Sequence, residues 1–151
     1  MIIGKSYING VEAKVYRGAN LIYYPSIIFN GTFDNNILGW KNNGAVLSWN
    51  PLGYLNIVNT SNVKGAYQVF TTETGVTYKA SANSIGGSGA TRMIRCGDGS
   101  APDAGLVTSP TETDSALHEL TFTAISDRSY IYLRHATTGN INWDNVEVKE
   151  I

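Results

Sequence analysis

Short runs in which apolar and polar residues alternate recur along this chain. In "VTYKASA", residues 76–82, Val, Tyr and Ala alternate with Thr, Lys and Ser. The same alternation appears in "GYLNIV", "AYQVF", "ATRMIRC", "LHELTFTA", "SYIYLRH" and "NWDNVEVKEI". Successive side chains of a β-strand point to opposite faces of the sheet, so this pattern is typical of strands that bury one face. No long segment shows the apolar spacing that an amphipathic helix requires.

Turn-forming residues separate these runs. Gly, Asn, Asp and Ser bound most of the apolar stretches, which divides the chain into roughly eight to ten short strands. Ser84–Ala90 and Gly97–Ala116 are predicted to be long loops, and the second encloses one short apolar stretch at residues 105–107. Strands of this length and spacing indicate an all-β fold, either a β-sandwich or a barrel.

The first 25 residues form a β-patterned unit that is too short to bury a core. Turn signals at Asn9–Gly10 and Gly18–Asn20 separate three alternating runs, and Pro25 ends strand pairing. The predicted strands of this meander are Lys5–Ile8, Val11–Arg17 and Leu21–Tyr24. The sequence therefore predicts a small N-terminal β-meander arm, residues 1–25, followed by one larger β-domain, residues 26–151.

Composition supports a folded domain and argues against nucleic acid and membranes as partners. Hydrophobic residues make up 42% of the 151 residues and charged residues 15%, which is typical of a chain that folds around a core. The net charge of −1 and the scattered Lys and Arg residues give no basis for nucleic-acid binding. No apolar run approaches the roughly 18 residues that span a bilayer, so no membrane insertion is expected. Cys96 is the only cysteine, which excludes an intrachain disulfide.

Three short motifs follow one another along residues 26–151. They read "NGTFDNNILGW" at residues 30–40, "AYQVFTTETGVTYKASA" at residues 66–82 and "INWDNVEVKEI" at residues 141–151. In this order they resemble the jelly-roll carbohydrate-binding modules of families 4, 9 and 22, which accompany cellulases and xylanases and share a galactose-binding-like β-sandwich. The resemblance implies a jelly-roll β-sandwich in which Trp40 and Trp143 fill the core.

Asp34 and Asp144 are the candidate metal ligands. By strand alternation Asp144 lies on the same face as Val146 and Val148, and a buried carboxylate needs a partner. The resemblance implies that this partner is a structural Ca²⁺ ion bound by Asp34, by Asp144 and by backbone carbonyl oxygens. Two alternatives remain open: Asp144 accepts backbone N–H hydrogen bonds, or a β-bulge turns it outward. Asn145 also stands where many members of the family carry a second Asp.

Glycan contacts are expected to come from aromatic rings and planar polar side chains. Trp49, predicted at a turn, and the nearby Tyr54 are candidate platforms for a sugar ring. Arg92, Arg95 and Arg134 are candidate hydrogen-bond donors from neighbouring strands. For each of these residues a structural role is the alternative. Some tyrosines lie in strands whose exposed face the pattern does not fix, namely Tyr67, Tyr130 and Tyr132.

The sequence offers no catalytic constellation. It contains no nucleophile-elbow motif, and His118 and His135 stand singly in strand patterns without metal-ligand spacing. The separation of a glycosidase carboxylate pair cannot be obtained from sequence spacing. The protein is therefore expected not to be an enzyme, and no catalytic residue is assigned.

The N-terminal stretch "INGVEAKVYRGANLIY", residues 8–23, resembles short β units that are common in structural proteins of tailed phages. The resemblance and the unpaired edges of so small a sheet indicate a docking arm that extends a partner's sheet. The candidate interface anchors are Tyr16, Arg17, Leu21 and Tyr24. The alternative is that residues 1–25 pack on their own sandwich as additional strands.

These observations together predict a non-enzymatic bacteriophage virion protein, displayed on the particle surface as a capsid decoration, a head fibre or a tail-associated protein. Its expected partners are phage capsid or tail proteins, and it is expected to form a homo-oligomer, a trimer by analogy with other fibres. The sandwich would face outward and bind host glycans weakly. The alternative is a secreted carbohydrate-binding module of a glycoside hydrolase system. The opening "MIIGKSYING" lacks the basic start and apolar block of a signal peptide, which favours the first interpretation.

Overall fold

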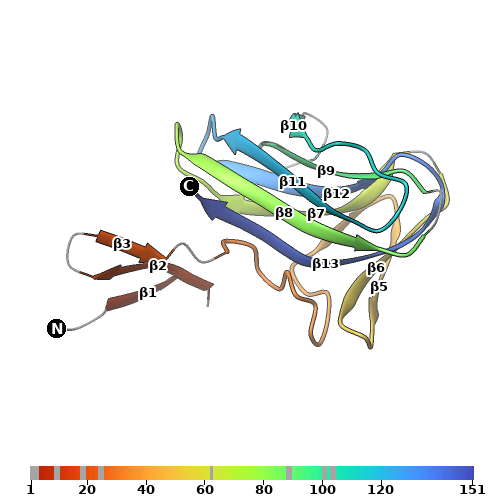
Figure 1. The fold of residues 1–151 in the computed structure, drawn as a ribbon, viewed down its shortest axis with the longest axis horizontal. Helices are drawn as coiled ribbons and strands as arrows, with labels where there is room; N and C mark the ends of the chain where they lie inside the picture. Colours follow the sequence, from red (N-terminus) through yellow and green to blue (C-terminus); the bar gives the residue numbers. More distant parts are fainter. Residues whose placement is uncertain are drawn as a thin grey trace.

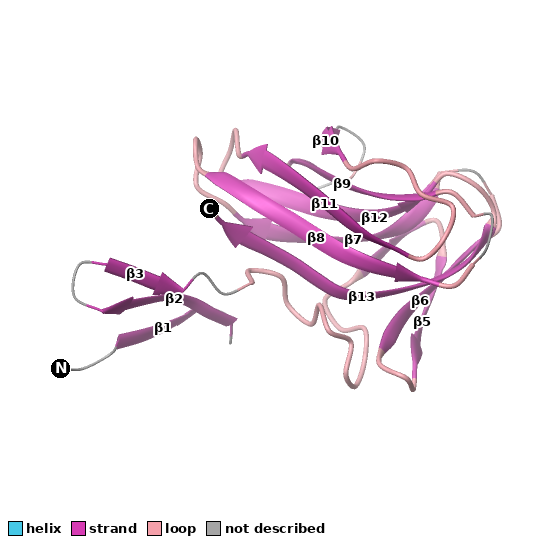
Figure 2. Ribbon diagram, viewed as in Figure 1, coloured by secondary structure: helices cyan, strands magenta, loops and turns pink. Residues whose placement is uncertain are grey.

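The computed structural model describes the backbone of residues 4–8, 11–17, 20–23, 26–61, 63–87, 90–99, 102 and 105–151, and side chains from residue 26 onward except those of residues 105 and 106. Within these ranges the chain is all-β. Two five-stranded sheets pack face to face, and a three-stranded sheet precedes them (Figures 1 and 2). The predicted jelly-roll sandwich with an N-terminal meander is therefore confirmed. No described helix is long and apolar enough to cross a membrane.

Each sheet of the sandwich takes its name from its central strand. The β12 sheet contains β4 (Lys41–Asn43), β7 (Lys64–Thr71), β9 (Arg92–Asp98), β10 (Gly105–Thr108) and β12 (Arg128–His135). The β13 sheet contains β5 (Val46–Asn50), β6 (Tyr54–Asn59), β8 (Thr77–Ile85), β11 (Ala116–Thr123) and β13 (Gly139–Glu150). Their strand orders are β10-β9-β12-β7-β4 and β11-β8-β13-β6-β5. The chain thus crosses repeatedly between the sheets, as in other jelly rolls.

The hydrophobic core fills the space between the two sheets. Ile57 and Trp143 of the β13 sheet and Leu133 of the β12 sheet are fully buried there. The alternation predicted for residues 76–82 is confirmed, because every second residue of β8 is buried. Trp40 is also buried, with 8% of its surface exposed, so both predicted core tryptophans are confirmed.

The first and last motifs of the sequence meet in space. The Val146 N–H donates to the Gly31 carbonyl oxygen at 2.9 Å, and a Cβ atom on Gly31 would lie 2.0 Å from the Val146 carbonyl oxygen. Only a glycine permits this approach. The middle motif joins them through Gln68, whose side-chain amide accepts from the Phe29 N–H at 2.7 Å and donates to the Phe29 carbonyl oxygen at 2.8 Å. The three motifs therefore hold one another in place in the fold.

A β-bulge in β13 overturns one prediction. The register with β8 shifts between Asp144 and Glu147, and Asn145 has a left-handed backbone with φ of 50°. The extra residue changes the side-chain alternation, so Trp143 and Val146 both face the core. The prediction that Asp144 shares a core face with Val146 is wrong. Both alternatives are observed, because a bulge turns Asp144 outward and its carboxylate accepts from the Asn145 N–H.

The predicted loop Gly97–Ala116 is also partly wrong. β9 extends to Asp98, and the apolar stretch within the loop forms β10, which pairs with β9. A further isolated bridge joins Arg92 to Glu112. This segment therefore completes one edge of the β12 sheet.

The N-terminal meander consists of β1 (Gly4–Ile8), β2 (Val11–Arg17) and β3 (Asn20–Tyr23), paired antiparallel in the order β1-β2-β3. These bounds agree with the predicted strands to within one residue. None of the three described strands pairs with a strand of the sandwich. The side chains of the candidate anchors Tyr16, Arg17 and Leu21, and all of Tyr24, lie outside the described part of the chain.

Candidate functional site

The outer face of the β12 sheet carries a transverse row of aromatic and charged residues. Since Leu133 faces the core, its neighbours in β12 face outward. Tyr132 lies opposite Tyr67 of β7 on one side and opposite Arg95 of β9 on the other. Lys41 of β4 continues the row beyond Tyr67. Residues opposite one another in antiparallel strands have adjacent side chains, so this row is a continuous surface.

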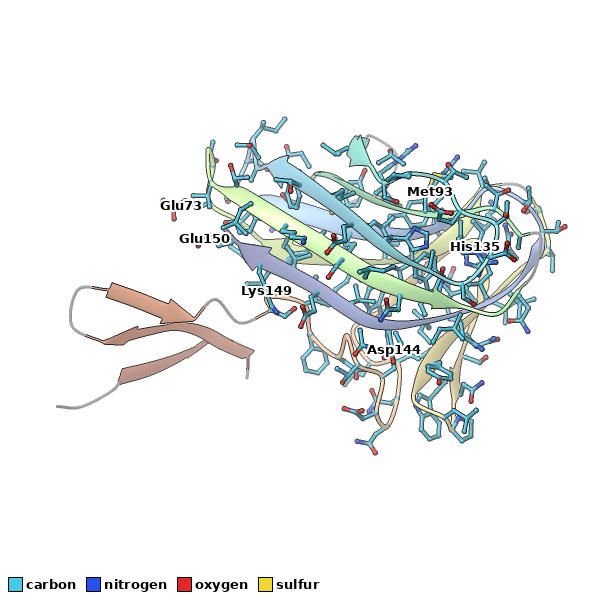
Figure 3. All side chains as sticks on the ribbon, in the orientation of Figure 1. Glu73, Met93, His135, Asp144, Lys149 and Glu150 are labelled. Atoms are coloured by element: carbon cyan, nitrogen blue, oxygen red, sulfur yellow. The ribbon has the colours of Figure 1, made fainter. Side chains whose placement is uncertain are left out.

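This face has two tiers. Tyr130, Tyr132 and Met93 form a floor, with only 0%, 1% and 6% of their surfaces exposed (Met93 is labelled in Figure 3). Above the floor, Tyr67 is half-buried and Lys41 is exposed. The aromatic floor is separate from the core between the sheets. Tyr67 is consequently the aromatic ring of this row that a ligand can reach.

Gly65 leaves room for the Tyr132 ring on this face. A Cβ atom on Gly65 of β7 would lie 2.8 Å from the Tyr132 ring and 2.0 Å from the Leu133 carbonyl oxygen. The Tyr132 ring therefore extends across β7 toward β4, where the Asn43 side-chain amide donates to its hydroxyl oxygen at 3.2 Å. This contact fixes the position of the ring beneath the row.

Two arginines stand close together on the same face. Arg134 donates from Nη1 to the Met93 sulfur at 3.1 Å, while its buried Nε has no acceptor among the described residues. Arg95 donates from Nε to the Thr108 hydroxyl at 3.3 Å. Burial, and then the nearby charge of Arg95, lower the pKa of Arg134, whereas Tyr132 raises it. Arg134 Nε is too buried for a ligand to reach, so the donors that this face offers a ligand are the terminal guanidinium nitrogens of Arg134 and of Arg95.

Of the residues predicted to contact a glycan, Arg95 and Arg134 lie on this face. Tyr54 lies on the outer face of the β13 sheet, since its neighbour Leu55 is buried. Trp49 lies in the edge strand β5 with 38% of its surface exposed, and its Nε1 donates to the Phe33 carbonyl oxygen at 2.7 Å. The structure therefore does not bring Trp49 and Tyr54 together with Arg134.

The prediction that Arg92 contacts a glycan is wrong. Its side chain is fully buried. Nε donates to the Ala90 carbonyl oxygen at 3.1 Å and Nη2 to the Thr113 carbonyl oxygen at 2.8 Å, with further bonds to the carbonyls of Gly86 and Gly87. Arg92 joins the loops that contain Gly86, Ala90 and Thr113, and it cannot reach a glycan.

Sequence reasoning missed a buried cluster around Trp143. His118 and His135 are separated in sequence, but their ring centroids lie 5.1 and 6.1 Å from that of the Trp143 ring. His135 Nε2 accepts from Trp143 Nε1 at 3.0 Å, and His118 Nε2 lies 2.9 Å from the Ser84 hydroxyl. Burial, and then the charge of Arg92, lower the pKa of each histidine to about 4. Their places in the alternation, beside Leu120 and Leu133, were the signal that both face the core.

Asp34 and Asp144 form the candidate metal site. Asp144 Oδ1 accepts from the Asn145 N–H at 2.7 Å, and Asp34 Oδ2 accepts from the Thr32 hydroxyl at 2.7 Å. Burial raises the pKa of Asp144, the Asn145 N–H opposes this, and the charge of Asp34 raises it further. A cation beside both carboxylates would relieve that cost. Within the described ranges no group of three or more metal-binding side chains occurs, so backbone carbonyls or water would complete the coordination.

Comparisons with known proteins define the fold more closely than the function. No protein-family model and no curated protein sequence matches the chain. Among solved structures, a CBM4 structure has a TM-score of 0.65 at 19% identity, with 82% of this chain and 99% of the other covered. The N-terminal cellulose-binding domain of β-1,4-glucanase C from Cellulomonas fimi has a TM-score of 0.61 at 20% identity, covering 83% of this chain and 97% of that one.

A phage protein shares the same architecture. The enzymatically active domain of tailspike protein 4 from bacteriophage CBA120 has a TM-score of 0.58 at 17% identity, covering 83% of this chain and 21% of that domain's chain. At these levels of identity the similarity concerns the fold. Residues 26–151 therefore adopt the jelly-roll β-sandwich fold of carbohydrate-binding modules, as their motifs predicted.

Proposed function

We propose that the protein binds glycans through the outer face of the β12 sheet and carries out no catalysis. One observation carries this proposal: an accessible aromatic ring, Tyr67, stands beside charged hydrogen-bond donors above a buried aromatic floor. A sugar ring offers an apolar C–H face and a rim of hydroxyl groups. An aromatic ring matches the first, and arginine, lysine and asparagine side chains match the second. The similar folds named CBM4 and cellulose-binding domain support this assignment.

A glycan array screen tests the proposal. We expect the protein to bind a subset of glycans, and Tyr67→Ala to weaken that binding roughly tenfold because stacking area is lost. Tyr54→Ala is the matched control, because Tyr54 lies on the outer face of the other sheet. Absence of any bound glycan, or equal losses in the two variants, would contradict the proposal.

We further propose that the sandwich is displayed on a phage particle, with residues 1–25 docking to a capsid or tail protein. Strands β1 and β3 are the edges of the small sheet, and unpaired edges can extend the sheet of a partner. The tailspike similarity supports a phage setting. The cellulose-binding domain favours the alternative, a secreted carbohydrate-binding module, equally well. Detection of the protein in purified phage particles by mass spectrometry distinguishes the two.

Self-association is the third part of the proposal. Large apolar side chains are exposed at Leu38, Val46 and Leu52, with 67%, 62% and 77% of their surfaces accessible. Such side chains favour protein contacts over solvation. We expect a homo-oligomer, a trimer by analogy with phage fibres, and light scattering that finds only monomer at high concentration would contradict this.

A further inference from the structure

Charge is unevenly divided between the two sheets, although the chain has a net charge of only −1. The strands of the β12 sheet contain six basic residues, Lys41, Lys64, Arg92, Arg95, Arg128 and Arg134, and one acidic residue, Asp98. The strands of the β13 sheet contain two basic residues, Lys79 and Lys149, and four acidic ones, Glu119, Asp144, Glu147 and Glu150. Arg92 is buried, but even without it the β12 sheet is the predominantly cationic one.

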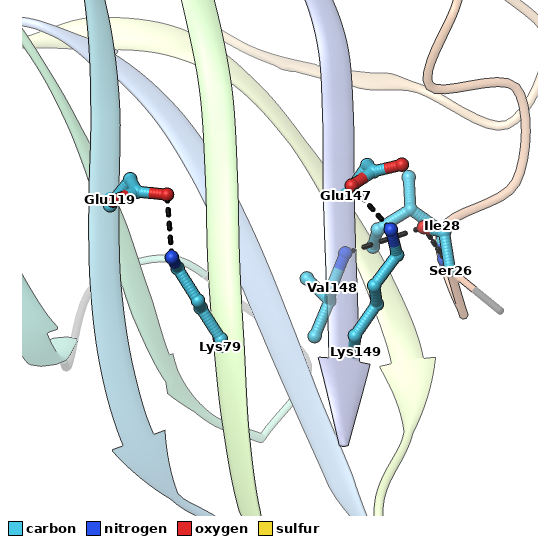
Figure 4. Close-up of polar contacts among 7 residues, drawn as sticks. All are labelled: Ser26, Ile28, Lys79, Glu119, Glu147, Val148 and Lys149. Atoms are coloured by element: carbon cyan, nitrogen blue, oxygen red, sulfur yellow. Dashed lines mark hydrogen bonds and ion pairs between the residues drawn. The ribbon is translucent and has the colours of Figure 1, made fainter. Parts of the chain in front are cut away.

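Ion pairing follows the same division. Both lysines of the β13 sheet are neutralised, Lys79 by Glu119 and Lys149 by Glu147, each at 2.7 Å (Figure 4). On the β12 sheet, neither Arg95 nor Arg134 forms an ion pair with any described carboxylate. The two arginines contact a hydroxyl and a sulfur instead, and both are weak partners for a cation.

Arg134 is the residue that most needs an anionic partner. Its Nε is buried without an acceptor among the described residues, and the neighbouring Arg95 repels its charge. A buried cationic donor without a counter-charge costs free energy, and that cost falls when an anion binds. The two terminal nitrogens of a guanidinium also form a pair of donors whose spacing fits a carboxylate, and this pair does not require the buried Nε.

We propose that the glycan bound by this face carries carboxylate groups, as polymers of uronic acids do. This inference rests on the proposed glycan-binding function. Arg134 and Arg95 receive the sugar carboxylate, while Tyr67, one strand further along the row, stacks on a sugar ring. A neutral sugar would leave both arginine charges uncompensated. The arginines would therefore select glycans that carry a carboxylate. Stacking on Tyr67 would contribute affinity for sugar rings of any kind.

The test compares acidic polysaccharides with the same polymers after reduction of their carboxyl groups to alcohols. Polygalacturonate, alginate and hyaluronate are suitable probes, measured by affinity electrophoresis and calorimetry. We expect at least one to bind, and its reduced form to bind roughly tenfold more weakly, because charge-assisted hydrogen bonds are lost. Binding of the acidic form should also weaken as salt is raised.

Matched charge variants locate the effect. Arg134→Gln and Arg95→Gln should each weaken binding of the acidic polymer roughly tenfold, while binding of the reduced polymer changes little. Lys79→Gln removes the same charge from the other sheet and should change neither. Arg134→Lys keeps the charge but loses the paired donors, so it should give an intermediate loss. If Arg134→Gln lowers Tm strongly, the test relies on Arg95→Gln, because the hydrogen bond from Arg95 to Thr108 is exposed to solvent.

Different failures have different meanings. If a neutral glycan binds this face and none of the three acidic polymers binds more tightly than its reduced form, the carboxylate inference is wrong and the proposed function stands. Tighter binding of single-stranded DNA or of anionic vesicles than of any acidic polymer would also overturn the inference. If no glycan of either kind binds, both proposals fail.

Discussion

His118 and His135 place two titratable rings against one buried indole. The pKa of each is lowered to about 4, so in the folded protein both are neutral well below the pH at which they protonate in the unfolded chain. A group whose pKa is lowered by folding contributes stability that is present above its unfolded pKa and is lost as pH falls. The cluster around Trp143 is therefore an acid-sensitive part of the core.

The free energy of unfolding is predicted to fall by about 2 kcal/mol per histidine between about pH 7 and about pH 5. Chemical denaturation at a series of pH values measures this. His118→Gln retains a hydrogen-bond acceptor without titrating, so this variant should be less stable at neutral pH but should lose about half of the pH dependence. A stability that is unchanged between these pH values would contradict the account of both rings.

At this scale, sequence reasoning succeeded where strand alternation was unbroken and failed where it was broken. Tyr78, Ala80 and Ala82 were correctly predicted to face the core. Asp144 was misplaced because one left-handed residue, Asn145, shifts the alternation, and no pattern in "NWDNVEV" announces a bulge. Arg92 was misassigned because its carbonyl partners come from loops, whose positions depend on tertiary structure.

At the scale of elements, the segment from Ser26 to Trp40 is held against β13. The Ile27 N–H donates to the Val148 carbonyl oxygen at 2.9 Å, and the Ser26 hydroxyl oxygen accepts from the N–H groups of Ile28 and Val148 (Figure 4). Further along, Asp34 of this segment approaches Asp144 of β13 (labelled in Figure 3). A cation between these two carboxylates would join the same two elements a second time.

Ca²⁺ is predicted to raise Tm by roughly 5 °C, because it binds the folded state and offsets repulsion between Asp34 and Asp144. Thermal unfolding with excess Ca²⁺ and with chelator measures the difference. The effect should vanish at low pH, because the raised pKa of Asp144 makes that carboxyl protonate early.

Two Asp→Asn variants control this experiment. Asp34→Asn should abolish the response to Ca²⁺ and raise Tm in chelator, since it removes one of two repelling charges. Asp127→Asn changes an exposed carboxylate near the β11–β12 turn and should leave the response intact. Equal Tm values with Ca²⁺ and chelator would rule out the metal site.

The sequence identified the long strands better than the short edge strands. β8 and β11 have clear alternation, and both were predicted. β4 has three residues and β10 has four, and both gain their strand conformation by pairing with a longer neighbour. The row of residues on the outer face of the β12 sheet could not be predicted either. Alternation shows which residues of one strand share a face, but it does not show which strands lie next to one another in the sheet.

At the scale of the whole molecule, the sandwich begins at Ser26. The contacts of Ser26, Ile27 and Ile28 with β13 connect this point of the chain to the sandwich. The strands of residues 1–25 pair only among themselves in the described part of the chain. The two units are therefore expected to be separable.

Deleting residues 1–25 is predicted to leave the sandwich folded with a Tm within a few degrees of the full chain, and to abolish attachment to the particle. Deleting residues 1–30 is the contrasting variant, because it also removes buried Ile28 and the Phe29–Gln68 hydrogen bonds. That variant should lose several kcal/mol of stability. If removal of residues 1–25 alone unfolds the protein, the arm is part of the sandwich and the docking proposal is wrong.

The central claim, that the outer face of the β12 sheet binds glycans, is tested most directly by mapping backbone amide shifts in NMR spectra during titration with a glycan that binds. The predicted shifts concentrate in β7, β9 and β12, around Tyr67, Arg95 and Arg134, and they are much smaller in Tyr67→Ala at the same subsaturating glycan concentration. Shifts that concentrate instead in the β5–β6 hairpin around Trp49 and Tyr54, with the β12 sheet unchanged, would contradict the claim.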